Sequence, residues 1–128
     1  MNAGIATQSG TFRIGGELPV HRLGFGAMRV TGPGIWGPPV DRAEALRTLR
    51  RVPELGIDFI DTADSYGAGH NEELLGRFIK GKRAQLRIAT KFGIVREPGR
   101  YERRIDNSPG YIRSACEASL RRLGVDHI

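Results

Sequence analysis

The sequence predicts an α/β fold in which strands alternate with helices around a parallel sheet. Short apolar segments alternate with amphipathic helical segments along the 128 residues, an order that gives parallel pairing through right-handed crossovers. Asp61 and Tyr66 also follow one apolar segment, and Lys91 ends another. Polar side chains at the carboxyl ends of successive strands are typical of a (β/α)8 barrel. Because such a barrel needs roughly 250 residues, we expect a partial barrel: an N-terminal hairpin, about three β/α units and the start of strand four.

An open, doubly wound sheet is the alternative architecture. Its usual mark is a Gly-x-Gly-x-x-Gly turn between a strand and a helix. Gly24-Phe25-Gly26 supplies two of the three glycines, and a Pro/Gly-rich loop rather than a helix follows it. A dinucleotide-binding module of the Rossmann type therefore rests on this glycine pair alone.

The first forty residues predict a hairpin, a strand and a long loop. The expected segments are a disordered stretch at 1–10, short strands at 11–18 and 19–23, a strand at 23–27 and a loop at 31–39. Gly15-Gly16 between two alternating segments indicates the hairpin turn. The density of proline and glycine in the loop excludes a regular hydrogen-bonded ladder there.

The first helix is expected to begin after Asp41 and to end at Gly56. Asp41 followed by Glu44 is a capping box, and apolar residues at helical spacing run from it towards the glycine. Pro53 lies inside this pattern, where it removes one backbone hydrogen bond and crowds the preceding turn. We expect a kink or a 3₁₀ last turn at that position.

Two further β/α units follow the first helix. The expected segments are a strand at 57–61, a helix beginning near residue 71, a strand at 86–90, a charged connection at 93–107, a helix at 109–123 and a strand opening at 125–128. Asn71 is expected to cap the second helix. Ser108 and Pro109 supply the cap and first-turn proline of the third, which Gly124 ends. Cys116 lies on that helix's apolar face and is expected in the core.

Composition excludes several classes of protein. One cysteine in 128 residues excludes a disulfide framework, and the N-terminus lacks the features of a signal peptide, so a cytoplasmic setting is expected. No apolar run approaches the roughly 20 residues that a membrane span needs. The net charge is +6, and the arginines sit mostly in helical stretches beside acids. This arrangement favours a solvated surface over nucleic-acid binding. His21 and His70 lack the spacing of a metal site, so no metal is expected.

Asp61, Tyr66 and Lys91 together suit carbonyl reduction. A phenol, with a pKa near about 10, protonates an alkoxide efficiently at neutral pH only when a nearby cation lowers that pKa. Lys91 is the available cation, and Asp61 is placed to keep its ammonium charged and oriented. Singly, each residue has a structural explanation, as a turn acid, a rim aromatic or a surface charge. Their joint position at the ends of two successive strands favours function.

Four segments match the motifs of one enzyme family. They are Leu23-Gly24-Phe25-Gly26-Ala27-Met28, the run from Gly56 to Gly67 with Asn71-Glu72, Ile88-Ala89-Thr90-Lys91, and the run from Ser119 to Ile128. On these residues the chain resembles the N-terminal part of the aldo-keto reductase family, ending at the start of barrel strand four. The resemblance implies an NAD(P)H-dependent enzyme that reduces aldehydes or ketones to alcohols, with Tyr66 as proton donor and Lys91 and Asp61 tuning it.

The resemblance also implies where the other parts of the site lie. The family's catalytic histidine stands at the end of strand four, and His127 falls at the start of that strand, several positions before it. The cofactor is NADPH, with NADH as the alternative, and its contacts carried over to this chain are Gly26, Ala27, Met28 and Asp61. Trp36 matches an aromatic wall of the substrate pocket, and a hydrophobic plug under a long loop is the other explanation.

Two hypotheses from different classes follow. In the first, residues 1–128 are the N-terminal portion of a single reductase barrel domain that acts on small carbonyl substrates. In the second, the chain is a truncated half-barrel, inactive because it lacks the catalytic histidine and most of the cofactor site. The sequence does not select the substrate or the oligomeric state.

Overall fold

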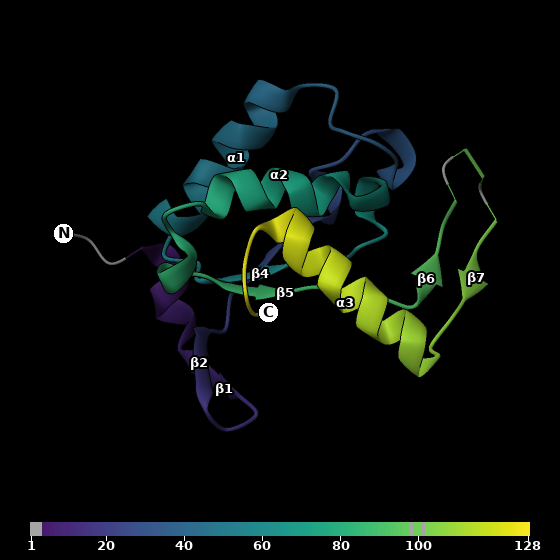
Figure 1. The fold of residues 1–128 in the computed structure, drawn as a ribbon. Coiled ribbons are helices and arrows are strands. Elements are labelled where there is room, and N and C mark those ends of the chain that lie inside the picture. The colour runs from purple at the N-terminus through teal and green to yellow at the C-terminus, as the bar shows by residue number, and fades with distance from the viewer. Residues whose placement is uncertain (1–3, 98, 101) are drawn as a thin grey trace.

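The computed structural model describes residues 4–97, 99–100 and 102–128 (Figure 1). In chain order its elements are the 3₁₀ helix η1 (Ile5–Ser9), β1 (Thr11–Ile14), β2 (Leu18–His21), β3 (Phe25–Gly26), η2 (Ala27–Arg29), η3 (Pro33–Ile35), α1 (Arg42–Glu54), β4 (Phe59–Asp61), η4 (Tyr66–Gly69), α2 (His70–Ile79), η5 (Arg83–Gln85), β5 (Arg87–Ala89), β6 (Ile94–Val95), β7 (Arg104–Ile105) and α3 (Pro109–Leu123).

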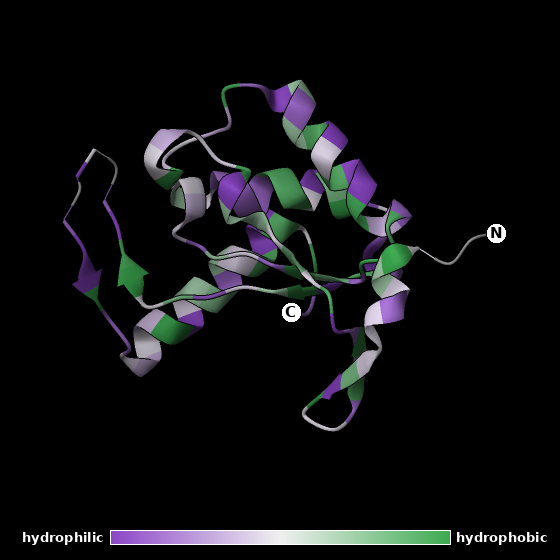
Figure 2. Ribbon diagram, turned by 180° about the vertical axis from the view of Figure 1, so that it is seen from behind, coloured by the Kyte–Doolittle hydropathy of each residue, from purple (hydrophilic) through white to green (hydrophobic). Residues whose placement is uncertain are grey.

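Strands β3, β4 and β5 form a parallel sheet in that order, as the strand–helix alternation predicts. Phe25 lies opposite Ile60, and Ile60 lies opposite Ile88, so chain order and spatial order agree. Helices α1, α2 and α3 cover one side of this sheet, and the opposite side carries no helix of the described residues (Figures 1 and 2). The strands are shorter than the sequence predicts, and β3 turns into η2 directly after Gly26.

The hydrophobic core lies between the sheet and its helices. Its fully buried large side chains are Leu49, Ile60, Leu75, Ile79, Leu86 and Leu123. Helix α2 crosses α3 at Gly76, where a Cβ atom would stand 2.5 Å from the carbonyl oxygen of Arg122 and 2.8 Å from that of Leu123. Any side chain at this position would push the two helices apart, so the glycine permits their close contact.

Helix α1 begins directly after Asp41, as the sequence predicts, and ends at Glu54, two residues before the predicted Gly56. The Asp41 carboxylate accepts a hydrogen bond from the Glu44 backbone N–H at 2.9 Å, which confirms the N-terminal cap. The helix continues through Pro53 to Glu54. It finishes with the Gly56 N–H donating to the Pro53 carbonyl at 2.9 Å, an i to i+3 bond of the expected 3₁₀ type.

The N-terminal residues differ from the expectation of disorder at 1–10. Residues 5–9 form η1, and Ala6 is fully buried. The Ala6 N–H donates to the Leu55 carbonyl at 2.8 Å, so this segment is tied to the end of α1. No periodic pattern in the sequence indicates this contact, because Ala6 and Leu55 are far apart along the chain. Residues 1–3 lie outside the described residues.

The N-terminal hairpin is as predicted, whereas a second hairpin was not. Strands β1 and β2 pair antiparallel around the Gly15-Gly16 turn. The charged connection at 93–107 contains the antiparallel pair β6 and β7, which projects from the end of the sheet (Figure 1). Two residues per strand are too few to produce a visible alternation of apolar and polar residues, so the sequence predicted only a loop.

The third helix has the expected ends but a shifted buried face. The Ser108 hydroxyl accepts from the Tyr111 N–H at 3.4 Å, and Gly124 closes the helix in the left-handed region. The buried positions are Ala115, Ser119 and Leu123. Cys116 is exposed, so the prediction that it lies in the core is wrong. One residue turns a helix by about 100°, which moves Cys116 off the buried stripe.

Residues 125–128 do not form the strand that the sequence predicts. They have no strand pairing in the structure, although Val125 packs against the core. Arg83 holds the segment instead, because its guanidinium donates to the His127 carbonyl at 2.9 Å. Within the described residues, no helix is both long enough and apolar enough to cross a membrane.

Candidate active site

Asp61 and Lys91 form an ion pair at the carboxyl ends of adjacent strands. Asp61 is the last residue of β4, and Lys91 stands two residues beyond the end of β5. The Lys91 ammonium donates to the Asp61 carboxylate at 2.7 Å and to the Thr62 carbonyl at 2.7 Å. The lysine and aspartate side chains are 49% and 45% exposed, so this ion pair is accessible to a ligand.

The surroundings of Lys91 favour its charged form. Burial acts to lower the pKa of Lys91, but the hydrogen bond and the charge of Asp61, together with Tyr66, outweigh burial and raise that pKa. A lysine with a raised pKa keeps its proton at neutral pH. The ammonium is therefore a permanent cation beside the aspartate.

Tyr66 is brought to the same place by the turn that follows β4. The Lys91 ammonium lies 5.1 Å from the centre of the Tyr66 ring, over its face. Tyr66 opens η4, in which Gly67 and Ala68 both have positive φ angles, 59° and 54°. A positive φ costs energy in a residue other than glycine, so Ala68 is a strained position directly after the tyrosine. The three predicted catalytic residues thus converge.

Asn71 holds the loops under this site together. It is 1% exposed, and the Thr62 hydroxyl donates to its side-chain oxygen at 2.6 Å. Its side-chain nitrogen donates to the carbonyls of Ala27 at 2.9 Å and Val30 at 2.8 Å. The sequence predicts Asn71 as a helix cap, which is wrong, because Gly69 is the N-cap of α2. A clue was present, since Asn71 shares the apolar helix face with Leu74 and Leu75.

A second acid–base cluster lies beside the site and was also missed by the sequence reasoning. Glu72 is fully buried and contacts Thr90 and Arg122. Asp64 lies nearby, and burial, followed by the charge of Glu72, raises its pKa to about 6. The partners of Glu72 stand 18 and 50 residues away along the chain, so no local pattern could indicate them.

The segment predicted to contact the cofactor lies next to Asp61. Gly26 pairs with Asp61 across the parallel strands and is exposed, and a Cβ atom added to it would have no neighbour within 4 Å. This open backbone fits the close approach of a ligand. The Ala27 carbonyl already accepts from Asn71, and the Met28 carbonyl accepts from Thr31 at 2.7 Å. These two carbonyls therefore have partners within the protein.

Trp36 lies in the loop that packs against the Tyr66 turn. A Cβ atom at Gly67 would stand 2.7 Å from the Gly37 carbonyl, so the two segments are in contact. The Trp36 ring is half-buried, and the Arg96 guanidinium of the β6–β7 hairpin lies 5.4 Å from its centre. The aromatic ring thus connects the loop after β3 to the β6–β7 hairpin.

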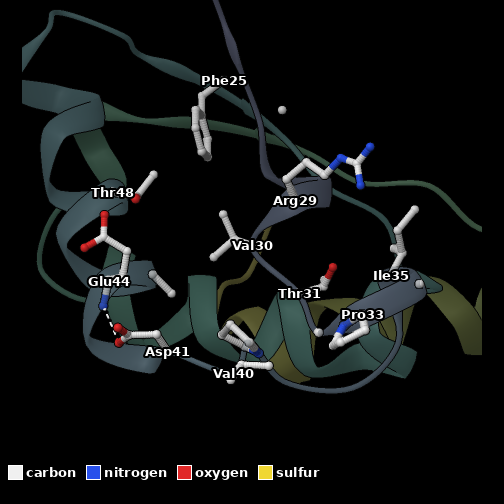
Figure 3. A pocket seen from close by; sticks show the side chains of 15 residues that line it. Phe25, Arg29, Val30, Thr31, Pro33, Ile35, Val40, Asp41, Glu44 and Thr48 are labelled. Atoms are coloured by element: carbon white, nitrogen blue, oxygen red, sulfur yellow. Dashed lines mark hydrogen bonds between the residues drawn. The ribbon is translucent and has the colours of Figure 1, made fainter.

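A cavity of about 570 Å³ opens on the other part of this loop (Figure 3). Arg29, Val30 and Pro33 line it from the loop side, and Glu44 and Thr48 line it from α1. Neither Trp36 nor any of the three converging residues borders it. Gly26, which pairs with Asp61, does border it, so the cavity adjoins the candidate active site at this residue.

The histidines are bonded to nearby groups. His21 Nδ1 lies 2.8 Å from the Gly56 carbonyl oxygen, and His70 lies 3.5 Å from Glu73. Among the residues that the structure describes, no three His, Cys, Asp or Glu side chains are grouped to hold a metal ion.

The sequence model of the Aldo/keto reductase family matches residues 22–128, and the chain belongs to this family. An uncharacterized oxidoreductase of Schizosaccharomyces pombe is 48% identical over 123 residues, which are 96% of this chain. An aldo-keto reductase of the same yeast, named with NADP(+), is 39% identical over 92% of this chain. The holo form of an aldo-keto reductase from Bacillus halodurans superimposes on 92% of the chain with a TM-score of 0.81 and 39% identity.

The chain spans only part of these proteins. It covers 39% and 34% of the two yeast proteins and 37% of the solved Bacillus structure. The solved structures it resembles are (β/α)8 barrels of the same family, so the three-stranded parallel sheet and its helices are part of such a barrel. Both the predicted family and the predicted fold class are confirmed.

Proposed function

We propose that the protein containing this chain reduces small aldehydes or ketones to alcohols with NADPH, and that Tyr66 donates the proton. The observation that carries the proposal is the ammonium of Lys91, which is bonded to Asp61 and lies over the ring of Tyr66. An acid, a cation and a phenol in contact at the end of two parallel strands suit general acid catalysis.

Each of the three residues has a distinct task in this proposal. NADPH supplies a hydride to the carbonyl carbon when it is bound. The Tyr66 hydroxyl gives its proton to the carbonyl oxygen, which completes the alcohol and leaves a phenolate. The Lys91 ammonium stabilises that phenolate, because opposite charges at short range favour the ionised form. Asp61 keeps the ammonium charged and fixed in position through its 2.7 Å hydrogen bond.

The cofactor contacts that this chain would supply are Gly26, Ala27, Met28 and Asp61. The open backbone at Gly26 beside the Asp61 carboxylate supports this proposal. NADPH is preferred to NADH because one relative is named with NADP(+). We also propose Trp36 as a wall of the substrate pocket, on the contact between its loop and the Tyr66 turn, and the cytoplasm as the location.

The test is NADPH oxidation with an aromatic aldehyde, measured on the 128-residue chain and on any longer natural protein that contains it. Tyr66→Phe is expected to lower kcat by about 10²–10⁴-fold, the usual contribution of general acid catalysis. Tyr111→Phe on α3 is the matched control and is expected to leave kcat unchanged. Equal rates for wild type and Tyr66→Phe would reject Tyr66 as the proton donor.

The inactive half-barrel remains the second candidate for the 128-residue chain alone. Strands β3 and β5 are both edges of the sheet within the described residues, and open edges favour association with other chains. This candidate predicts that the isolated chain shows no turnover and no change in NADPH fluorescence, whereas a longer protein that contains it shows turnover.

A further inference from the structure

A carboxylate is buried behind the lysine of the proposed site. Glu72 on α2 is 0% exposed, and both of its carboxylate oxygens are used. One accepts from the Thr90 hydroxyl at 2.5 Å, and the other accepts from the Arg122 Nε at 2.6 Å. Burying an ion pair costs solvation that the attraction between the charges does not reliably recover. Such a group is therefore weak evidence for stability and calls for another explanation.

Thr90 connects this carboxylate to Lys91. It is the residue directly before the lysine and follows the end of β5 at Ala89. Backbone bonds lie on both sides of it, from the Thr62 N–H to the Ala89 carbonyl at 2.9 Å and from the Asp64 N–H to the Lys91 carbonyl at 3.1 Å. In extended chain, successive side chains point to opposite faces. The Thr90 hydroxyl thus turns to α2 while the Lys91 ammonium turns to Asp61.

Arg122 connects the same carboxylate to the Tyr66 turn. A Cβ atom at Gly69 would stand 3.0 Å from Arg122 Cδ and 3.3 Å from its Nε, so the arginine stem lies against this glycine. Gly69 closes η4, the turn that Tyr66 opens, and has a φ of +95°. Arg122 Nη2 also donates to the Ser119 hydroxyl at 3.3 Å, which fixes the guanidinium on α3. Glu72 is therefore linked to the segment that carries Lys91 through Thr90, and to the turn that carries Tyr66 through Arg122.

We propose that Glu72, Thr90 and Arg122 are positioning residues, which fix the end of β5 so that the Lys91 ammonium reaches Asp61. The proposal rests on the proposed function for the role of Lys91. Breaking the bond between Thr90 and Glu72 frees the residue before the lysine, and the ammonium then spends less time on the aspartate. The positioning unit acts through backbone placement and touches no substrate.

The test is the pKa of Lys91, measured by NMR titration of lysine-labelled protein, with the Lys91→Arg variant to assign the signal. Thr90→Val keeps the shape of the side chain and removes its hydroxyl. We expect a downward shift of the Lys91 pKa in Thr90→Val and a value close to wild type in Thr90→Ser, which restores the hydroxyl. Thr48→Val on α1 is the control. Identical Lys91 titrations in Thr90→Val and Thr90→Ser would overturn the proposal.

Arg122→Lys serves if Thr90→Val does not fold. It retains a positive charge but loses the planar guanidinium that contacts Glu72 and Ser119, and it is expected to lower the Lys91 pKa as well; an unchanged titration would overturn the proposal. Activity is read separately. If the protein shows no turnover but Thr90→Val still lowers the pKa of Lys91, the proposed function fails and the positioning role stands. If the protein is active but Thr90→Val leaves the pKa of Lys91 unchanged, the positioning role fails and the proposed function stands.

Discussion

Two acid–cation pairs of nearly equal length lie on opposite sides of the end of β5. Asp61 and Lys91 meet at 2.7 Å with side chains that are 45% and 49% exposed. Glu72 and Arg122 meet at 2.6 Å with side chains that are 0% and 25% exposed. An exposed pair contributes little to stability because water screens it, whereas removing one partner of a buried pair leaves an unpaired charge. Exposure, not distance, separates the proposed catalytic pair from the buried pair.

The largest expected effect is on the buried pair. Glu72→Gln removes the negative charge that faces Arg122, and we expect the free energy of unfolding to fall by about 3–5 kcal/mol. Urea denaturation followed by circular dichroism measures this loss. Glu73→Gln is the control on the adjacent, half-exposed residue. Equal stability of the two variants would remove the distinction between the pairs.

The next effect concerns the polar residue beside the buried pair. Asn71→Leu keeps a similar volume and removes the partner of the Thr62 hydroxyl and of the Val30 carbonyl. The Ala27 carbonyl loses one of two partners, because it also accepts from the Val30 N–H. Unsatisfied buried polar groups cost about 1–3 kcal/mol, and urea denaturation is expected to show a loss in this range. Asn107→Leu, at an exposed position, should change the midpoint little. A stable Asn71→Leu would contradict the role assigned to these bonds.

A smaller effect is expected on the exposed pair. Asp61→Asn removes the charge that faces Lys91, yet the free energy of unfolding should change by less than about 1 kcal/mol, because both side chains are half-exposed. The same urea series measures it. A loss as large as that of Glu72→Gln would show that the exposed pair is structural as well.

A separate effect is a pH dependence from Asp64. Burial and the charge of Glu72 raise its pKa from 3.8 to about 6 in the folded protein. The folded state then binds this proton more tightly than the unfolded state, so the contribution of Asp64 to stability falls as pH rises through that window. The unfolding free energy of wild type minus that of Asp64→Asn is expected to fall from about pH 4 to about pH 7, because the wild type loses stability over this range. A difference independent of pH would contradict the assignment.

The exposed pair could be predicted from the sequence and the buried pair could not. Asp61 and Lys91 end apolar segments, and the carboxyl ends of parallel strands meet at one edge of a sheet. The partners of Glu72 lie 18 and 50 residues away along the chain. Two of the three partners of Asn71 lie 41 and 44 residues away, and the third is Thr62. The local pattern therefore assigned Asn71 to the helix terminus, where polar residues are common, and indicated no partner for Glu72.

The errors in the fold have related physical causes. Cys116 was assigned to the core because it sits among apolar residues, although the contact with α2 at Gly76 selects the neighbouring stripe of α3. The short β6–β7 pair carries too few residues for an alternating pattern. Helix caps at Asp41, Ser108 and Gly124 were predictable because capping depends on residues adjacent in sequence.

The most direct test of the account is the pKa of Lys91 in the wild-type chain and in Asp61→Asn. The account predicts that wild-type Lys91 titrates above the ordinary lysine value of about 10.4, and that Asp61→Asn lowers its pKa because the hydrogen-bonded carboxylate is gone. A wild-type Lys91 that titrates at or below the ordinary value, or one that is unchanged by Asp61→Asn, would contradict the coupling on which the proposed proton donor depends.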